Sequence, residues 1–336
     1  MAPRAALPLL AGALLLAGTA AAQERPPVID LHLHALAADD QGPPPLGVCF
    51  QRGNWPVWDQ ARSWPEVLMA HAKNPPCDDP IWSPLTDDEL VTETLDVLRR
   101  ANVTAVVSGS PERVRRWREA EGGERLIPGL GFRIGRDDIS PDSLRALITT
   151  GQVAVLAEVT NQYAGIEPSA PRFEPYLALA EELDVPVGIH VGTGPPAAPY
   201  LGYTRYRARL HSPLLLEEVL LRHPRPRLYL MHAGWPMLDD LLALLFAHPQ
   251  VHVEVGVLVF ALPRAEFYRC LQRIVEAGFG KRVMFGSDQM VWPGVIEPGI
   301  RSIEEAPFLT PGQKRDILHD NAARFLRLDA GRTSGR

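Results

Sequence analysis

Short apolar runs rich in β-branched residues alternate with longer segments of helical periodicity along most of the chain. Runs that are apolar at nearly every position are typical of strands buried on both faces, as in parallel sheets. We therefore predict strands over residues 28–34, 103–109, 126–132, 153–160, 186–192, 227–234, 251–257 and 282–288.

The segments between these runs place apolar residues three or four positions apart, which predicts amphipathic helices. They cover residues 87–100, 111–120, 141–149, 174–183, 214–222, 237–247, 264–277 and 311–326. Strands that are each followed by a helix predict a (β/α)8 TIM barrel. An open doubly wound sheet is the alternative, but its glycine-rich first turn is missing, because Gly129, Gly131 and Gly135 have the wrong spacing. We expect one domain over residues 23–330 and a tail over 331–336.

The stretch 36–85, after the first predicted strand, is irregular and rich in proline, glycine and tryptophan. Loops that follow barrel strands lie at the C-terminal face, and tryptophans need a surface to pack on. The stretch is therefore predicted to be an insertion that forms a wall or lid over that face. It contains both Cys49 and Cys77, which favours a disulfide between them.

The first 22 residues have the pattern of a secretory signal peptide. Arg4 supplies the positive end, residues 7–18 are the apolar core, and cleavage is expected near Ala22. A membrane anchor is the alternative, but Pro8 interrupts the apolar run and no basic cluster follows it. We expect a periplasmic or secreted protein that has no membrane anchor after cleavage.

Charge narrows the range of partners. The chain has 34 basic and 40 acidic residues and a net charge of −6, which gives no support for a nucleic-acid-binding surface. A small-molecule substrate is the expected partner, and a homo-oligomer is possible.

Histidines and carboxylates stand at the ends of the predicted strands, where TIM-barrel enzymes place their catalytic groups. His32 and His34 are two residues apart on the first strand, so both project to the same face. Imidazole and carboxylate ligands together suit Zn²⁺, with Mn²⁺ or Fe²⁺ possible, as one or two ions. The predicted ligands are His32, His34, Glu158, His190, His232 and Asp288.

In this strand order, the set resembles the amidohydrolase superfamily, especially its amidohydrolase-related (amidohydrolase 2) branch. The segments 163–165, 189–192, 231–236, 285–288 and 321–326 support the resemblance. It implies a metal-dependent hydrolase that attacks an amide, ester or lactone bond with metal-activated water. None of the three lysines ends a strand, so a bridging carbamylated lysine is excluded. Glu158 occupies the corresponding place, as in branches similar to the TatD-like nucleases.

The resemblance also implies roles. His32, His34 and Asp288 would hold the first ion, and Asp288 would take a proton from the attacking water. His190, with or without Glu158, would complete one or two sites. His232 would bind a second ion or, in a one-ion site, act as a base or oxyanion partner. A non-oxidative decarboxylase similar to aminocarboxymuconate-semialdehyde decarboxylase and a non-catalytic exported metal-binding protein are the alternatives.

Several polar and aromatic residues fall in connections that should overhang the mouth of the barrel. Arginines there would bind a substrate carboxylate or phosphate through paired hydrogen bonds. Alternatively, they are solvent-exposed loop charges that have no binding role. The predicted substrate contacts are Arg133, Tyr163, Arg205, His211 and Trp235.

Overall fold

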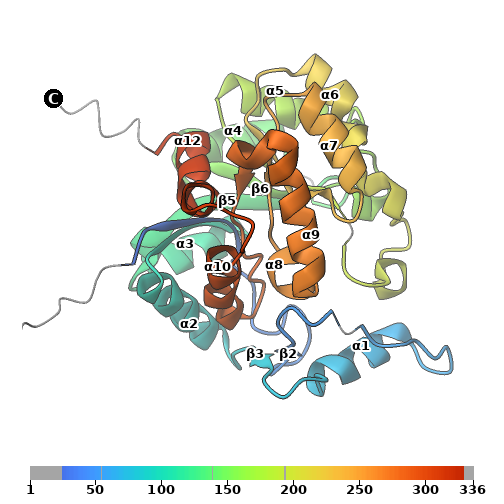
Figure 1. The fold of residues 1–336 in the computed structure, drawn as a ribbon. Coiled ribbons are helices and arrows are strands. Elements are labelled where there is room, and N and C mark those ends of the chain that lie inside the picture. Colours follow the sequence, from blue (N-terminus) through green and yellow to red (C-terminus); the bar gives the residue numbers. More distant parts are fainter. Residues whose placement is uncertain (1–24, 54, 138, 193, 329–336) are drawn as a thin grey trace, which may run out of the picture.

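A computed structural model describes residues 25–53, 55–137, 139–192 and 194–328, and its fold is a (β/α)8 TIM barrel (Figure 1). The fold prediction is therefore confirmed. The eight parallel strands are β1 (Val28–His34), β4 (Val103–Ser108), β5 (Leu126–Arg133), β6 (Val155–Thr160), β7 (Val187–His190), β8 (Leu228–Met231), β9 (His252–Glu254) and β10 (Val283–Met284), paired in that order. At the seam, the Leu31 N–H donates to the Phe285 carbonyl at 3.0 Å, which joins β1 to the segment after β10.

Helices surround this sheet, and side-chain caps fix where several of them begin. Thr86 and Glu89 form a capping box at the start of α2 (Asp87–Arg100), while Ser110 and Ser140 each cap a helix that opens with proline. A π-helical turn over Asp316–Asp320 interrupts the last predicted helix. The barrel helices are α2 (Asp87–Arg100), α3 (Pro111–Glu119), α4 (Pro141–Thr149), α5 (Glu174–Glu182), α6 (Glu217–Arg222), α7 (Leu238–Ala247), α9 (Arg264–Ile274), α11 (Pro311–Arg315) and α12 (Asn321–Leu326). The sequence analysis missed α8 (Leu258–Ala261) and α10 (Ile296–Glu304).

The apolar core has two layers. The larger layer joins the outward faces of the strands to the helices. A smaller cluster gathers side chains from β1, β4, β6, β8 and β10 inside the barrel, together with α12. The Tyr229 hydroxyl crosses this interior and donates to the Leu31 carbonyl at 3.2 Å. The interior is therefore filled, and the chemistry is confined to the mouth.

Two strands carry an extra residue close to that mouth. The three steps along β1 from Asp30 to Leu33 match only two steps along β4, from Ala105 to Val107. The same one-residue shift occurs in β6 between Leu156 and Val159. A β-bulge breaks the strict in–out alternation of a strand, so it can turn a polar side chain inward beside an apolar one. The β1 bulge includes His32 and the β6 bulge includes Glu158.

The insertion is more regular than predicted. It contains the helix α1 (Trp64–Lys73) and a small antiparallel sheet of β2 (Gly47–Val48) and β3 (Ile81–Trp82). The expectation of a wholly irregular segment is wrong because Ser63 and Glu66 form a capping box that starts α1. A disulfide joins Cys49 to Cys77.

Hydrogen bonds fasten this insertion to the loops that follow the barrel strands. Trp64 Nε1–H donates to the Pro196 carbonyl at 2.9 Å, in the connection after β7. Trp292 Nε1–H, after β10, donates to the Leu46 carbonyl at 2.9 Å. In Figure 1, α1, β2 and β3 lie together beside the ring of barrel helices. The insertion therefore rests against the loop side of the barrel.

Within the described residues, no helix is long and apolar enough to cross a membrane. The predicted signal peptide, residues 1–22, lies outside the described residues, as does the tail 331–336.

Candidate metal centre

The six predicted ligands come together at the C-terminal ends of the strands. His32, Glu158 and His190 are carried by β1, β6 and β7, respectively, whereas His232 and Asp288 follow β8 and β10. Their side chains are mostly buried, and the most exposed, those of His34 and Glu158, retain 15% and 16% of their accessible area. The cluster is thus largely shielded from bulk water, with His34 and Glu158 as its most accessible members.

Three donor atoms form a first group. The Nε2 atoms of His32 and His34 are 3.0 Å apart, and Asp288 Oδ1 lies 3.3 and 3.0 Å from them. Ligands around a tetrahedral zinc ion with bonds of about 2.0–2.1 Å are roughly 3.3 Å from one another. These separations therefore fit a single ion held by the three residues.

A second group lies beside the first. His232 Nε2 is 3.0 Å from His190 Nδ1 and 3.1 Å from Glu158 Oε1, and that oxygen also contacts His190 Nδ1. The other oxygen of Glu158, Oε2, faces His34 Nε2 at 3.9 Å. One oxygen of the Glu158 carboxylate thus faces His190 and His232, and the other faces His34 of the first group.

The backbone holds Asp288 in place beside the first strand. The Asp288 N–H donates to the His32 carbonyl at 2.7 Å, and Asp288 has a left-handed φ of 53°. Aspartate is one of the few residues other than glycine that tolerate this conformation. The turn after β10 therefore presents the carboxylate to the two β1 histidines.

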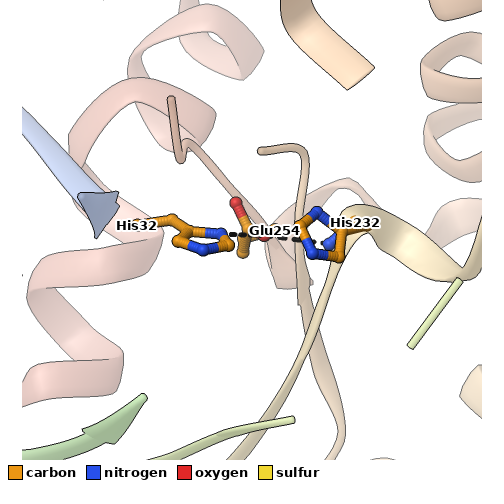
Figure 2. A group of neighbouring side chains, drawn as sticks. All are labelled: His32, His232 and Glu254. Atoms are coloured by element: carbon orange, nitrogen blue, oxygen red, sulfur yellow. Dashed lines mark hydrogen bonds and ion pairs between the residues drawn. The ribbon is translucent and has the colours of Figure 1, made fainter. Parts of the chain in front are cut away.

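Glu254, at the end of β9, is a functional candidate that the sequence analysis missed (Figure 2). Its buried Oε1 lies 3.1 Å from His32 Nδ1 and accepts the His232 N–H at 2.9 Å. Its Oε2 accepts the Gly256 N–H at 2.6 Å. The signal in the sequence was a lone acidic residue in the middle of the predicted strand 251–257.

Opposite charges inside the cluster shift its pKa values. Burial disfavours the charged form of His32, but the carboxylates of Asp288 and Glu254 outweigh it and raise the pKa of His32 to about 10. Burial likewise opposes ionisation of Glu158, yet His190 and His232 hold the pKa of Glu158 well below its ordinary value. The carboxylate is therefore ionised, as a metal ligand must be.

The donor set suits a divalent cation. Imidazole nitrogens and ionised carboxylates are the ligands that Zn²⁺, Mn²⁺ and Fe²⁺ share. Within the described residues, three overlapping sets have ligand atoms within 4.8 Å of one another: His32, His232 and Glu254; His32, His34 and Glu158; and Glu158, His190 and His232. The residues present therefore fit one ion or two.

Two predicted substrate contacts adjoin this cluster. The Tyr163 hydroxyl lies 3.5 Å from His190 Nε2, and the ring centroid of His211 is 5.4 Å from that of His190. His211 is fully buried, and neither of its ring nitrogens has a hydrogen-bond partner among the described residues. Burial, aided by the charge of His190, lowers the pKa of His211 to about 3. A neutral imidazole with unused hydrogen-bonding capacity thus stands beside the cluster.

A cavity of about 160 Å³ opens next to Tyr163 and is also lined by Arg133 and Arg205. Arg133 is already paired with Asp137, through hydrogen bonds of 2.8 and 2.9 Å. Trp235 is not among the residues lining this cavity, and its Nε1–H donates to Glu266 at 2.9 Å. The structure therefore places Tyr163, Arg133 and Arg205 at one cavity and leaves Trp235 outside its lining.

A (β/α)8 barrel with histidines and carboxylates gathered at its strand ends defines a metal-dependent enzyme of the amidohydrolase class. Residues 29–328 match the family model described as Amidohydrolase, and the chain belongs to this family. This membership supports a metal-dependent enzyme over the alternative of a non-catalytic metal-binding protein.

Solved structures resemble the chain in fold at low sequence identity. An uncharacterised TIM-barrel protein from Bordetella bronchiseptica is 16% identical, with a TM-score of 0.57 over 90% of this chain and 99% of that one. The 5-carboxyvanillate decarboxylase from Sphingomonas paucimobilis is 17% identical, with a TM-score of 0.53 and coverage of 90% and 99%. A probable 2-pyrone-4,6-dicarboxylic acid hydrolase from Acinetobacter baumannii, with citric acid bound, is 14% identical, with a TM-score of 0.53 and coverage of 89% and 99%. No curated protein matches the sequence.

Proposed function

We propose that the protein is a metal-dependent hydrolase that cleaves an amide, ester or lactone bond in a small molecule. The placement of Glu158 carries this proposal, because its two oxygens face separate ligand groups. A carboxylate in that position is suited to bridge two ions, whereas a one-ion site does not need it. The favoured metal is Zn²⁺, with Mn²⁺ or Fe²⁺ as alternatives.

In this mechanism His32, His34 and Asp288 would hold one ion, and His190, His232 and Glu158 would hold a second. When bound, a divalent cation supplies Lewis-acid chemistry, which lowers the pKa of water and polarises a carbonyl group. Asp288 would accept a proton from the attacking water and would pass it to the leaving group. Its Oδ2 lies 3.9 Å from His232 Nδ1, whereas its Oδ1 faces the two β1 histidines.

Tyr163 and His211 would orient the substrate. Burial raises the pKa of Tyr163 well above its ordinary value, so its hydroxyl stays protonated and can donate to a substrate oxygen. His211 is neutral and buried, so it can donate or accept a hydrogen bond without adding charge to the cluster. Arg205 at the cavity would pair with an anionic group of the substrate.

Non-oxidative decarboxylation is the second candidate. The arginines at the cavity favour a substrate that carries a carboxylate, and proteins of similar fold are described both as a decarboxylase and as a hydrolase. A decarboxylase would break a carbon–carbon bond and release carbon dioxide, so product analysis separates the two reactions. We also propose that the protein is exported and acts in the periplasm or outside the cell.

Metal stoichiometry tests the bridging role. Protein purified without chelators should contain close to two ions per chain by elemental mass spectrometry, and the Glu158→Gln variant should lose one of them. A single ion in the wild type, unchanged in the variant, would contradict the bridge and favour the one-ion decarboxylase arrangement.

Turnover tests the proton-transfer role. Asp288→Asn should lose about 10³-fold or more in kcat on any ester, lactone or amide that the wild type hydrolyses, while retaining most of its metal. Normal turnover in Asp288→Asn would exclude this residue as the base.

A further inference from the structure

A second and larger concavity, of about 460 Å³, lies beside the cavity at Tyr163. Its lining is strongly basic although the chain as a whole carries a net charge of −6. Glu167 is the only acidic residue in the lining, which also contains Arg172, Arg205, Arg207 and Arg209. We call this concavity the arginine groove.

Two loops build the groove, one after β6 and one after β7, and they are packed tightly together. Gly165 in the first loop has a left-handed φ of 72°, and a Cβ atom there would lie 2.9 Å from the Arg205 carbonyl oxygen in the second. The Arg207 guanidinium donates to the carbonyls of Thr204 and Tyr206, at 3.1 and 2.7 Å. Arg207 is therefore held in position before any ligand arrives, which reduces the entropy lost on binding.

The other three arginines have no comparable partners. Within the described part of the chain, the side chains of Arg172, Arg205 and Arg209 form no hydrogen bond or ion pair. Some exposed arginines elsewhere are paired, for example Arg145 with Glu182 and Arg269 with Glu266, whereas the scattered Arg118 and Arg301 have no such partner among the described residues. Unneutralised guanidinium groups that converge on one concavity leave their hydrogen-bond donors for an external anion.

We infer that the arginine groove is an anion-binding subsite that takes a multiply charged phosphate or carboxylate group. Guanidinium groups bind both kinds of oxyanion through paired hydrogen bonds, and several of them favour a ligand with more than one negative charge. The groove shares Ala164, Thr204 and Arg205 with the cavity at Tyr163, so a ligand can occupy both. The inference does not depend on the reaction that the metal centre performs.

Calorimetric titration of the metal-loaded protein tests the inference with two probes, inorganic pyrophosphate and the tricarboxylate tricarballylate. We expect saturable binding of at least one probe, weakened by added salt because the contacts are partly exposed. The stronger probe tells whether the groove prefers phosphate or carboxylate. If neither probe binds, the inference is wrong.

A pair of double variants locates the binding. Arg207→Gln/Arg209→Gln should weaken binding about tenfold or more, since it removes two charged donors. Arg118→Gln/Arg301→Gln is the matched control, because it removes the same charge from exposed positions on α3 and α10. Equal affinity in the two double variants would overturn the inference and assign the anion to the metal centre. Thermal melting checks that both variants are folded. Binding of a probe to the metal alone would be the same in both variants.

Discussion

Glu254 acts on the metal centre through two of its histidines. It accepts from the His232 backbone and faces His32 Nδ1, so it fixes the tautomer that leaves His32 Nε2 free for a metal. Glu254→Gln keeps the size of the side chain but removes its charge. We expect metal affinity to fall about 10- to 100-fold, because such supporting contacts typically contribute that much.

Competition with a chromophoric chelator measures this change directly and does not require a substrate. Glu297→Gln, which alters a carboxylate paired on the surface with Arg25 and Arg100, is a suitable control. Wild-type metal affinity in Glu254→Gln would show that Glu254 has only a packing role.

At the residue scale, the sequence analysis selected the side chains that the structure brings together at the mouth. Their convergence could be predicted from strand position, because the ends of parallel strands meet at one face of a barrel. The sequence analysis could not find Glu254, since only folding places the end of β9 behind His32. It also could not foresee that Arg133 pairs with Asp137.

At the element scale, the insertion depends on its disulfide. Cys49→Ser/Cys77→Ser removes a crosslink over a sequence separation of 28. A disulfide that closes a loop of this length stabilises the folded segment relative to the unfolded chain by about 3–4 kcal/mol. We expect proteases to cleave within residues 36–85 much faster in the variant, while the barrel melts at nearly the same temperature. Limited proteolysis with mass spectrometry locates the cuts.

Reduction provides the control for this experiment. A mild reductant should make the wild type as sensitive to proteolysis as the variant and should leave the variant unchanged. Equal cleavage of all samples would mean that α1 and its hydrogen bonds hold the insertion without the crosslink.

A second element-scale prediction concerns the packing of α5 against the end of α6. His223 lies 2.6 Å from Glu174 and 3.1 Å from Glu181, and although burial opposes it, these contacts raise the pKa of His223. The folded protein then holds the proton more tightly than the unfolded chain. The stabilisation is complete below the ordinary histidine pKa of 6.5 and is lost as pH rises through the folded value.

Urea unfolding of the wild type and of His223→Gln at several pH values measures this contribution. The difference in the free energy of unfolding should be largest in mild acid and shrink as the pH rises above 6.5. Effects of the metal centre cancel in the difference. If the difference in the free energy of unfolding stays constant with pH, the charge of His223 does not contribute to stability.

For the whole molecule, a bound metal should stabilise the closed barrel. Its ligands come from β1, β6 and β7 and from the turns after β8 and β10, so the ion joins segments from around the ring. At a free metal concentration about 100 times Kd, binding to the folded protein raises its free energy of unfolding by about 2.7 kcal/mol. We expect dialysis against a chelator to lower Tm by roughly 5 °C.

Calorimetry with and without the chelator measures the shift, and adding Zn²⁺ back should reverse it. The Glu158→Gln variant should show a smaller shift, since it retains fewer ligands. If the melting curves with and without the chelator coincide, no metal binds at the strand ends.

The sequence by itself determined the barrel and the kinds of residue at its strand ends. The alternation of apolar strands with amphipathic helices is a local pattern, and the polar residues at the strand ends are visible within it. Several helix boundaries are also determined by local contacts, because caps such as Thr86 and Ser140 bond to residues only a few positions away. The helix α1 was equally local, although its signal at Ser63 was overlooked.

The tertiary structure alone decided how these residues face one another. The bulges in β1 and β6 depend on pairing with neighbouring strands, and they turn His32 and Glu158 toward the mouth. The position of Glu254 behind His32 and the meeting of two arginine-rich loops join residues far apart in the chain. Such contacts arise from sheet closure and loop packing, which no local pattern encodes.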